Sequence, residues 1–266
     1  MAVPPTPDLL ARVDTLACQA GDEVLRYHGK VRPGTKADGS PVTQADQAAE
    51  AIILKGLADL TPETPVVAEE AASAGHVPET DGGPFWLVDP LDGTKEFIRE
   101  DGKGEFTVNI ALIVDGQPIL GVVVAPALDI VYGGLCGVGA YRRWAGGDNE
   151  PIIARPAPVT GLTVVSSRSH GDTQALDALL QSAQVSNQRQ IGSSLKLCLV
   201  ASGEADIYPR LGPTMEWDIA AGQAVLAAAG GRVETLDGAP MAYAKKDFRN
   251  PHFVAYGRCP SIRPKR

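Results

Sequence analysis

Four acidic residues stand where this sequence could do chemistry. Glu69 and the pair Asp89/Asp92 each follow a short apolar segment, and Asp218 stands at the start of a predicted helix. The ends of strands are places from which rigid structure can aim a carboxylate into a cleft. Clustered carboxylates repel one another at neutral pH unless a cation lies between them. Hard oxygen donors without thiol or imidazole favour Mg²⁺, Mn²⁺ or Ca²⁺ over zinc, so the pattern predicts a site for such ions.

The segment from Asp89 to Thr94 reads Asp-Pro-Leu-Asp-Gly-Thr and is the most informative part of the chain. Its proline and glycine predict a tight turn that folds the two aspartates towards one point. A turn also presents backbone carbonyls inward, which makes the Leu91 carbonyl a further candidate ligand. Alone, such a segment more often shapes a surface turn, and Asp218 alone is more often a helix N-cap. The combination with Glu69 favours a metal site.

Apolar periodicity predicts the elements that position these carboxylates. In the first half we expect a helix that begins after the N-cap Thr6 and ends at Gly29, a helix over 43–60, strands over 65–68 and 85–88, a hairpin of 107–114 with 119–124 around Asp115-Gly116, and further strand over 132–141. In the second half we expect strands over 163–166 and 205–208 and near Val233 and Phe253, and helices over 173–183, 194–201 and 218–229.

This order of elements indicates a mixed α/β protein with helices layered on sheets. The stretch 146–161 is rich in proline and glycine and marks a join between two halves. We therefore divide the chain into residues 1–146, which carry most of the candidate ligands, and residues 147–266, which carry Asp218 and the residues expected to recognise a substrate.

The composition excludes several classes of function. The chain has 266 residues, a hydrophobic fraction of 44% and a formal net charge of −8, which suits a globular core and argues against binding a nucleic-acid polymer or an anionic membrane. A small anionic substrate remains compatible, because bound metal ions invert the local charge. The four cysteines form no Cys-x-x-Cys pair and are expected to be reduced, buried thiols. The sequence shows no signal peptide and no apolar run long enough to span a bilayer, so we expect a cytoplasmic protein.

Taken together, these residues resemble the inositol monophosphatase superfamily. The match comprises Asp89 to Thr94, Trp217-Asp218 with the Ala-Ala-Gly that follows, and the Glu-Glu pair that begins at Glu69. Within the superfamily, Lys95-Glu96-Phe97 and the segment 192–196 are similar to the bacterial 3′(2′),5′-bisphosphate nucleotidases of sulfur assimilation. The resemblance implies an alternating αβαβα sandwich with the site between its two halves.

The resemblance also implies a role for each matching residue. The expected metal ligands are Glu69, Asp89, the Leu91 carbonyl, Asp92 and Asp218. The expected catalytic residues are Asp46, Thr94 and Glu69, with the Thr94 hydroxyl accepting from the attacking water while it donates to Asp46. The expected substrate contacts are Glu69, Leu91, Asp92, Gly93, Thr94, Ser167, His170, Ser193, Lys196 and Asp218.

The residues that would bind the substrate also have simpler interpretations. Gly192-Ser193-Ser194 before a helix offers free backbone N–H groups to an anion, but either serine could instead simply cap that helix. His170 could be an exposed structural residue, and Lys36 could be solvated.

The resemblance implies hydrolysis of the 3′-phosphate of adenosine 3′,5′-bisphosphate, giving AMP and phosphate, with the 5′-phosphosulfate analogue as a further substrate. Two or three Mg²⁺ ions would serve this reaction, by direct in-line attack of water without a phosphoenzyme. Two alternatives stay open: the same chemistry on inositol, histidinol or sugar phosphates, and a catalytically idle protein that binds metal or nucleotide. A homodimer and peripheral attachment at the inner membrane also stay open.

Overall fold

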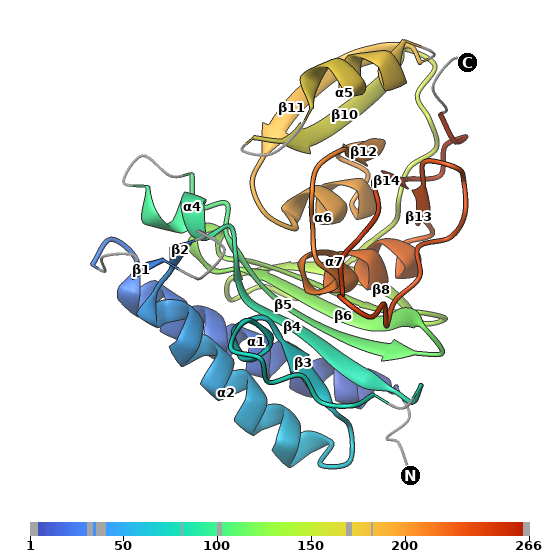
Figure 1. The fold of residues 1–266 in the computed structure, drawn as a ribbon. Helices are drawn as coiled ribbons and strands as arrows, with labels where there is room; N and C mark the ends of the chain where they lie inside the picture. Colours follow the sequence, from blue (N-terminus) through green and yellow to red (C-terminus); the bar gives the residue numbers. More distant parts are fainter. Residues whose placement is uncertain are drawn as a thin grey trace.

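The protein is built of five layers in which helices and sheets alternate (Figure 1). The structure is a computed structural model that describes residues 5–30, 34–35, 41–80, 82–99, 103–168, 172–181 and 183–262. The layers are, in order, α1 (Pro7–Tyr27) with α2 (Gln44–Leu60), a seven-stranded sheet, α6 (Leu195–Ala201) with α7 (Glu216–Ala228), a five-stranded sheet, and α5 (Thr173–Leu180). The predicted αβαβα sandwich is confirmed.

The seven-stranded sheet is antiparallel except for its first pair, β3 and β4. The hairpin at Asp115-Gly116 is confirmed, with both turn residues at positive φ. The strand expected over 132–141 is instead two paired strands, because the chain reverses near Gly137, whose φ is 82°. In spatial order the strands are β3 (Val66–Ala68), β4 (Phe85–Asp92), β5 (Thr107–Val114), β6 (Gln117–Ala125), β7 (Ile130–Leu135), β8 (Gly139–Trp144) and β9 (Glu150–Ile152).

The five-stranded sheet mixes parallel and antiparallel pairs. Its central strand β12 lies parallel to β10 and antiparallel to β14. Its edge strand β11 was not predicted, because its sequence is polar and its side chains are mostly exposed. In spatial order the strands are β11 (Val185–Ile191), β10 (Leu162–Ser167), β12 (Ile207–Arg210), β14 (Phe253–Tyr256) and β13 (Arg232–Thr235). The short elements of the fold are β1 (Gly34–Thr35), β2 (Pro41–Val42), α3 (Glu69–Ser73), α4 (Thr94–Ile98) and the 3₁₀ turn η1 (Pro126–Leu128).

The N-terminal helices begin as the sequence predicts. The Thr6 side chain accepts a hydrogen bond from the Leu9 backbone N–H at 3.2 Å, and Thr43 caps α2. The apolar faces of both helices pack on the seven-stranded sheet.

Helix α7 packs on the opposite face of the seven-stranded sheet, at close range. A Cβ atom added to Gly121 of β6 would lie 2.3 Å from the Ala221 carbonyl oxygen, so a glycine is required there. Because α7 is buried between the two sheets, its first turn, which carries Asp218, is held by the core.

Other expectations have mixed outcomes. All four cysteines are free thiols, as predicted, but only Cys198 and Cys259 are buried; Cys18 and Cys136 are partly exposed, against the expectation. The division at residue 146 stays a prediction. Strand β9 lies beyond residue 146 but pairs with β8 of the first half. In the ranges given above, no helix combines the length and apolar character needed to cross a membrane.

Candidate active site

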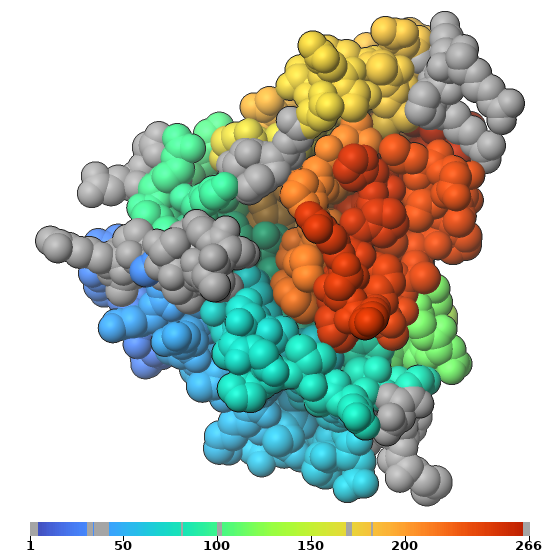
Figure 2. Space-filling view, in the orientation of Figure 1, coloured from blue at the N-terminus to red at the C-terminus, as the bar shows by residue number. Residues whose placement is uncertain are grey.

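A cavity of about 1070 Å³ lies where β4, α3, α4, β12 and the first turn of α7 meet. The space-filling view shows the surface hollowed where the teal N-terminal segments meet the orange C-terminal ones (Figure 2). Most of the predicted site residues line this cavity: Glu69, Asp89, Leu91, Asp92, Gly93, Thr94, Ser167, Ser193, Lys196 and Asp218. Among the described residues of the prediction, Asp46 lies outside the lining. His170 and Lys36 lie outside the described residues.

The Asp89–Asp92 segment is a bulged strand end rather than the predicted tight turn. Asp89 pairs with Asn109 and Asp92 with Thr107, so β4 carries one residue more than the facing strand. Such a bulge re-aims side chains, and here it brings both carboxylates to the cavity. The Leu91 backbone N–H donates to the Asp89 carboxylate at 3.0 Å.

The bend that follows depends on Gly93. This residue has a φ of 90°, and a Cβ atom on it would lie 3.1 Å from the Glu105 carbonyl oxygen. Glycine adopts this backbone conformation without steric cost, which explains why it separates Asp92 from Thr94.

Glu69 begins a short helix, α3, that was not predicted. The carboxylate of Glu50 on α2 accepts hydrogen bonds from the next two backbone N–H groups, those of Glu70 at 2.8 Å and Ala71 at 3.0 Å. Glu50 is only 6% exposed, and its negative charge suits the N-terminal end of a helix. It therefore fixes the backbone that carries Glu69, a role that sequence reasoning missed.

Asp218 is the third residue of α7 rather than its first. Helix α7 begins at Glu216, and the Asp218 carboxylate reaches back to accept a hydrogen bond from the Met215 backbone N–H at 2.9 Å. The carboxylate therefore has a structural anchor as well as a place in the cavity.

Glu69, Asp89, Asp92 and Asp218, here called the carboxylate cluster, interact strongly through their charges. Burial raises the pKa values of Asp89 and Asp218 well above the usual range, and the neighbouring carboxylates raise them further. Burial also raises the pKa of Asp92 to about 6, although the Lys196 ammonium opposes the shift. These directions are those of acidic groups crowded in a place of low dielectric constant without enough positive charge.

The donor set of the cluster fits a hard divalent cation. It consists of carboxylate oxygens together with the Leu91 carbonyl, and a cation would offset the repulsion that raises the pKa values. As the side chains stand, Glu69 is hydrogen-bonded to Asp89. In the described part of the chain, no three acidic, histidine or cysteine side chains yet converge closely enough to hold an ion.

The expected catalytic pair has other partners here. The buried Asp46 carboxylate accepts from both the backbone N–H and the hydroxyl of Thr43, each at 2.8 Å. The Thr94 hydroxyl donates to the Leu91 carbonyl oxygen at 3.2 Å. The pairing of Thr94 with Asp46 stays a prediction.

The segment before α6 is held firmly at the cavity wall. Ser193 has a positive φ of 46°. Ser194 occupies the N-cap position without a side-chain cap bond; its hydroxyl instead donates to Asn109 at 2.6 Å and so ties α6 to β5. The Lys196 ammonium donates to the carbonyl oxygens of Ile191 and Ser193, and burial lowers the pKa of this lysine to about 8.

The cavity also contains residues that were not predicted. Arg210 ends β12 and lies near enough to lower the pKa values of Asp92 and Asp218, against the effect of burial. The signal in the sequence that could have identified Arg210 was a basic residue at the end of an apolar strand. Lys246, Phe248 and Arg249 also line the cavity, in the loop that precedes Asn250-Pro251.

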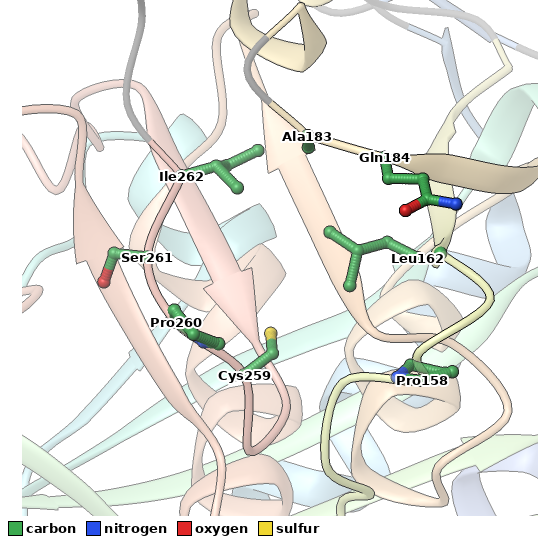
Figure 3. Close-up of a pocket in the computed structure, with 9 residues that line it drawn as sticks. Pro158, Leu162, Ala183, Gln184, Cys259, Pro260, Ser261 and Ile262 are labelled. Atoms are coloured by element: carbon green, nitrogen blue, oxygen red, sulfur yellow. The ribbon is translucent and has the colours of Figure 1, made fainter.

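A second cavity of about 490 Å³ lies beside the start of β10 (Figure 3). Leu162 and Ile262 extend towards each other across it, and Gln184, Ser261 and Cys259 supply the polar atoms of its side chains. Its lining holds no carboxylate and no cation, and burial raises the pKa of the Cys259 thiol. Of the two cavities, the larger one is therefore the one whose lining carries acidic and basic side chains.

The family model for the inositol monophosphatase family matches residues 8–258. The chain belongs to this family. It is 46% identical over 249 residues to the 3′(2′),5′-bisphosphate nucleotidase CysQ of Escherichia coli K12, a match that covers 92% of this chain and 98% of the relative. The CysQ of Buchnera aphidicola is 38% identical, with 93% of each chain covered.

Solved structures agree with the sequence matches. CysQ from Bacteroides thetaiotaomicron superimposes with a TM-score of 0.77 at 36% identity, over 94% of this chain and 97% of that one. An IMPase from Thermotoga maritima gives the same TM-score at 25% identity, over 94% and 92%.

Proposed function

We propose that the protein is a metal-dependent 3′(2′),5′-bisphosphate nucleotidase that hydrolyses the 3′-phosphate of adenosine 3′,5′-bisphosphate. The observation that carries this proposal is the carboxylate cluster, which lines one cavity together with Lys196 and Arg210. The nucleotidase relatives cover nearly the whole chain. The 5′-phosphosulfate analogue, which shares the 3′-phosphate, is the second substrate.

The cluster would hold the metal through Glu69, Asp89, Asp92 and Asp218, with the Leu91 carbonyl as a further ligand. When bound, Mg²⁺ lowers the pKa of water and neutralises phosphate oxygens. We propose two or three ions per site, since four carboxylates and the Leu91 carbonyl would offer more oxygen ligands than one ion needs.

The chain's own residues position the water and the phosphate. Thr94 stands next to the cluster, and rotation of its hydroxyl away from Leu91 would let it accept from the water while Asp46 receives the proton. The orientation of the Asp46 carboxylate is fixed, because the backbone N–H and the hydroxyl of Thr43 each donate a hydrogen bond to it.

The reaction is a direct displacement at phosphorus. The water oxygen forms a bond to phosphorus as the bond from phosphorus to the 3′-oxygen breaks. The 3′-oxygen leaves with the bonding electron pair and takes up a proton, giving AMP and inorganic phosphate. Lys196 and Arg210 contribute positive charge on the wall of the cavity, where they stabilise the phosphate oxygens.

The test is phosphate release from adenosine 3′,5′-bisphosphate, inositol 1-phosphate and fructose 1,6-bisphosphate, measured side by side with Mg²⁺ and with EDTA. We expect strong preference for the adenosine compound and loss of all release in EDTA. Preference for inositol or sugar phosphate would keep the metal chemistry and overturn the substrate. No release from any of them would favour an idle binding protein.

A further inference from the structure

Glu105 lies where the two halves of the active-site cavity meet, although it is not among the residues that line the cavity. Its carbonyl oxygen would lie 3.1 Å from a Cβ atom added to Gly93 and 2.7 Å from one added to Gly192. Gly93 forms the bend between Asp92 and Thr94, and Gly192 precedes α6 on the wall formed by the second half. Both segments approach the Glu105 backbone this closely because each has a glycine at the contact.

The Glu105 side chain is buried and holds two groups of the second half. The residue is 7% exposed. One of its carboxylate oxygens accepts from the Gly192 backbone N–H at 2.6 Å, and the same oxygen lies 2.7 Å from the Arg168 guanidinium. Arg168 follows β10 and also donates to the Gln190 carbonyl oxygen of β11 at 3.1 Å. Hydrogen bonds to an ionised acceptor are the strong ones, so Glu105 ties the start of β5 firmly to the Gly192 peptide.

The peptide bond between Ile191 and Gly192 connects Glu105 to Lys196. Its N–H donates to Glu105, and its carbonyl oxygen accepts from the Lys196 ammonium at 3.2 Å. The ammonium also donates to the carbonyl oxygen of Ser193, whose positive φ of 46° is uncommon for a residue other than glycine. Because a peptide bond is planar, its N–H and its carbonyl group cannot turn independently. By fixing the N–H, Glu105 therefore also fixes an acceptor of the buried ammonium.

Glu105 also acts on the charge of Lys196. Burial lowers the pKa of Lys196 to about 8, and the carboxylates of Asp92, Glu96 and Glu105 oppose this shift. Lys196 lines the cavity and Glu105 does not, so the influence of Glu105 on a bound phosphate passes through Lys196 and the peptide that holds it.

We propose, on the basis of the nucleotidase function above, that Glu105 is a positioning residue for hydrolysis, which holds the Lys196 ammonium in place through the Ile191–Gly192 peptide. The ammonium lies near enough to Asp92 of the carboxylate cluster to oppose the rise of its pKa. Its position therefore sets how much positive charge reaches a phosphate at the cluster. Without the Glu105 carboxylate the peptide loses the partner of its N–H, and the ammonium loses a fixed acceptor. A displacement of about 1 Å at such a group can cost about 100-fold in rate.

The test is a double-mutant cycle of Glu105→Ala and Lys196→Met. Lys196→Met removes the charge and keeps a long, unbranched side chain. If Glu105 acts through Lys196, its loss matters only while the ammonium is present, whereas a general loss of stability would not depend on Lys196. We expect Glu105→Ala to lower kcat/KM for adenosine 3′,5′-bisphosphate about tenfold in the wild-type background and less than about twofold in Lys196→Met. Glu105→Gln keeps an acceptor oxygen for the Gly192 N–H and should recover most of the activity.

The matched control is a buried carboxylate of the same kind away from the cavity. Asp206 is fully buried, binds the Arg155 guanidinium through two hydrogen bonds of 2.8 Å and accepts from the Thr163 backbone N–H at 2.6 Å, and it does not line the cavity. Asp206→Ala and Asp206→Asn should therefore lower Tm without changing kcat/KM of the folded protein.

Gly192→Ala displaces the same peptide by another route and replaces Glu105→Ala in the cycle if that variant does not fold. Its methyl group would lie 2.7 Å from the Glu105 carbonyl oxygen, so the peptide must shift. It should lower kcat/KM, again only while the Lys196 ammonium is present. A loss of the same factor in both backgrounds, or no loss in either, would overturn the Glu105 assignment and leave the nucleotidase function standing. No phosphate release from adenosine 3′,5′-bisphosphate by the wild-type protein would overturn both.

Discussion

The carboxylate cluster and the loop over residues 244–250 lie on one cavity but are built in opposite ways. The cluster sits at the ends of core elements, where Asp89 is buried and the other three carboxylates are partly buried, and burial with crowding raises the pKa values of its aspartates. The loop has cations that reach solvent, while its backbone is fixed by the buried Glu216. Burying several carboxylates costs free energy that a bound metal ion would offset. Exposed cations can instead bind a phosphate and release it.

The largest expected effect is on the cluster. Asp92→Asn removes one ligand charge and should lower kcat by about 1000-fold, equivalent to about 4 kcal/mol of transition-state stabilisation. Phosphate release at saturating Mg²⁺ measures it, and a thermal melt checks folding. The control Asp59→Asn makes the same change at an exposed helix position and should be neutral. Full activity of Asp92→Asn would remove this residue from the metal site.

A smaller effect is expected at Glu50, which holds the backbone next to Glu69 of the cluster. Glu50→Ala leaves two backbone N–H groups at the start of α3 without their acceptor, so Glu69 loses its alignment. We expect about tenfold lower activity and a higher Mg²⁺ concentration at half-maximal rate, as for residues that orient metal ligands.

Glu50→Gln keeps one acceptor oxygen and should recover part of the loss. Glu63→Ala, at an exposed position after α2, is the matched control. A Mg²⁺ dependence that stays unchanged in Glu50→Ala would show that Glu50 contributes only to folding.

The smallest effect is on thermal stability. The pKa of Asp92 rises from 3.8 to about 6 on folding, so between these pH values the folded chain binds more protons than the unfolded chain. In EDTA, stability is therefore present at low pH and is lost as the pH rises through about 6.

Mg²⁺ should replace those protons. At pH 7.5 we expect it to raise Tm by about 5 °C, and at pH 4.5 it should have little effect. Differential scanning fluorimetry in Mg²⁺ and in EDTA at both pH values measures this. An equal shift at both pH values would contradict a carboxylate site.

The sequence predicted the parts of the molecule that depend on local pattern. Apolar periodicity located α1 and α2, and Asp115-Gly116 located the β5–β6 hairpin. The residue types alone placed the aspartates at strand and helix ends, although the bulge at Asp89–Asp92 replaced the expected turn. Strand β11 escaped prediction because its pairing relies on the backbone, while its side chains are polar and exposed.

Contacts between residues far apart in the chain could not be predicted from the sequence. Glu50 acts on a backbone 20 residues further along the chain, and Glu216 holds the loop that begins 28 residues beyond it. Neither carboxylate differs locally from the solvated acids that most helices carry. Only the tertiary arrangement shows that both are buried and satisfied by backbone donors.

The most direct test of the account is calorimetric titration of Mg²⁺ into the wild-type protein, Asp92→Asn and Asp59→Asn, without substrate. We predict saturable binding to the wild-type protein and to Asp59→Asn, with affinity at least about tenfold weaker in Asp92→Asn. Equal affinity in all three proteins would contradict the claim that the carboxylate cluster is the metal centre.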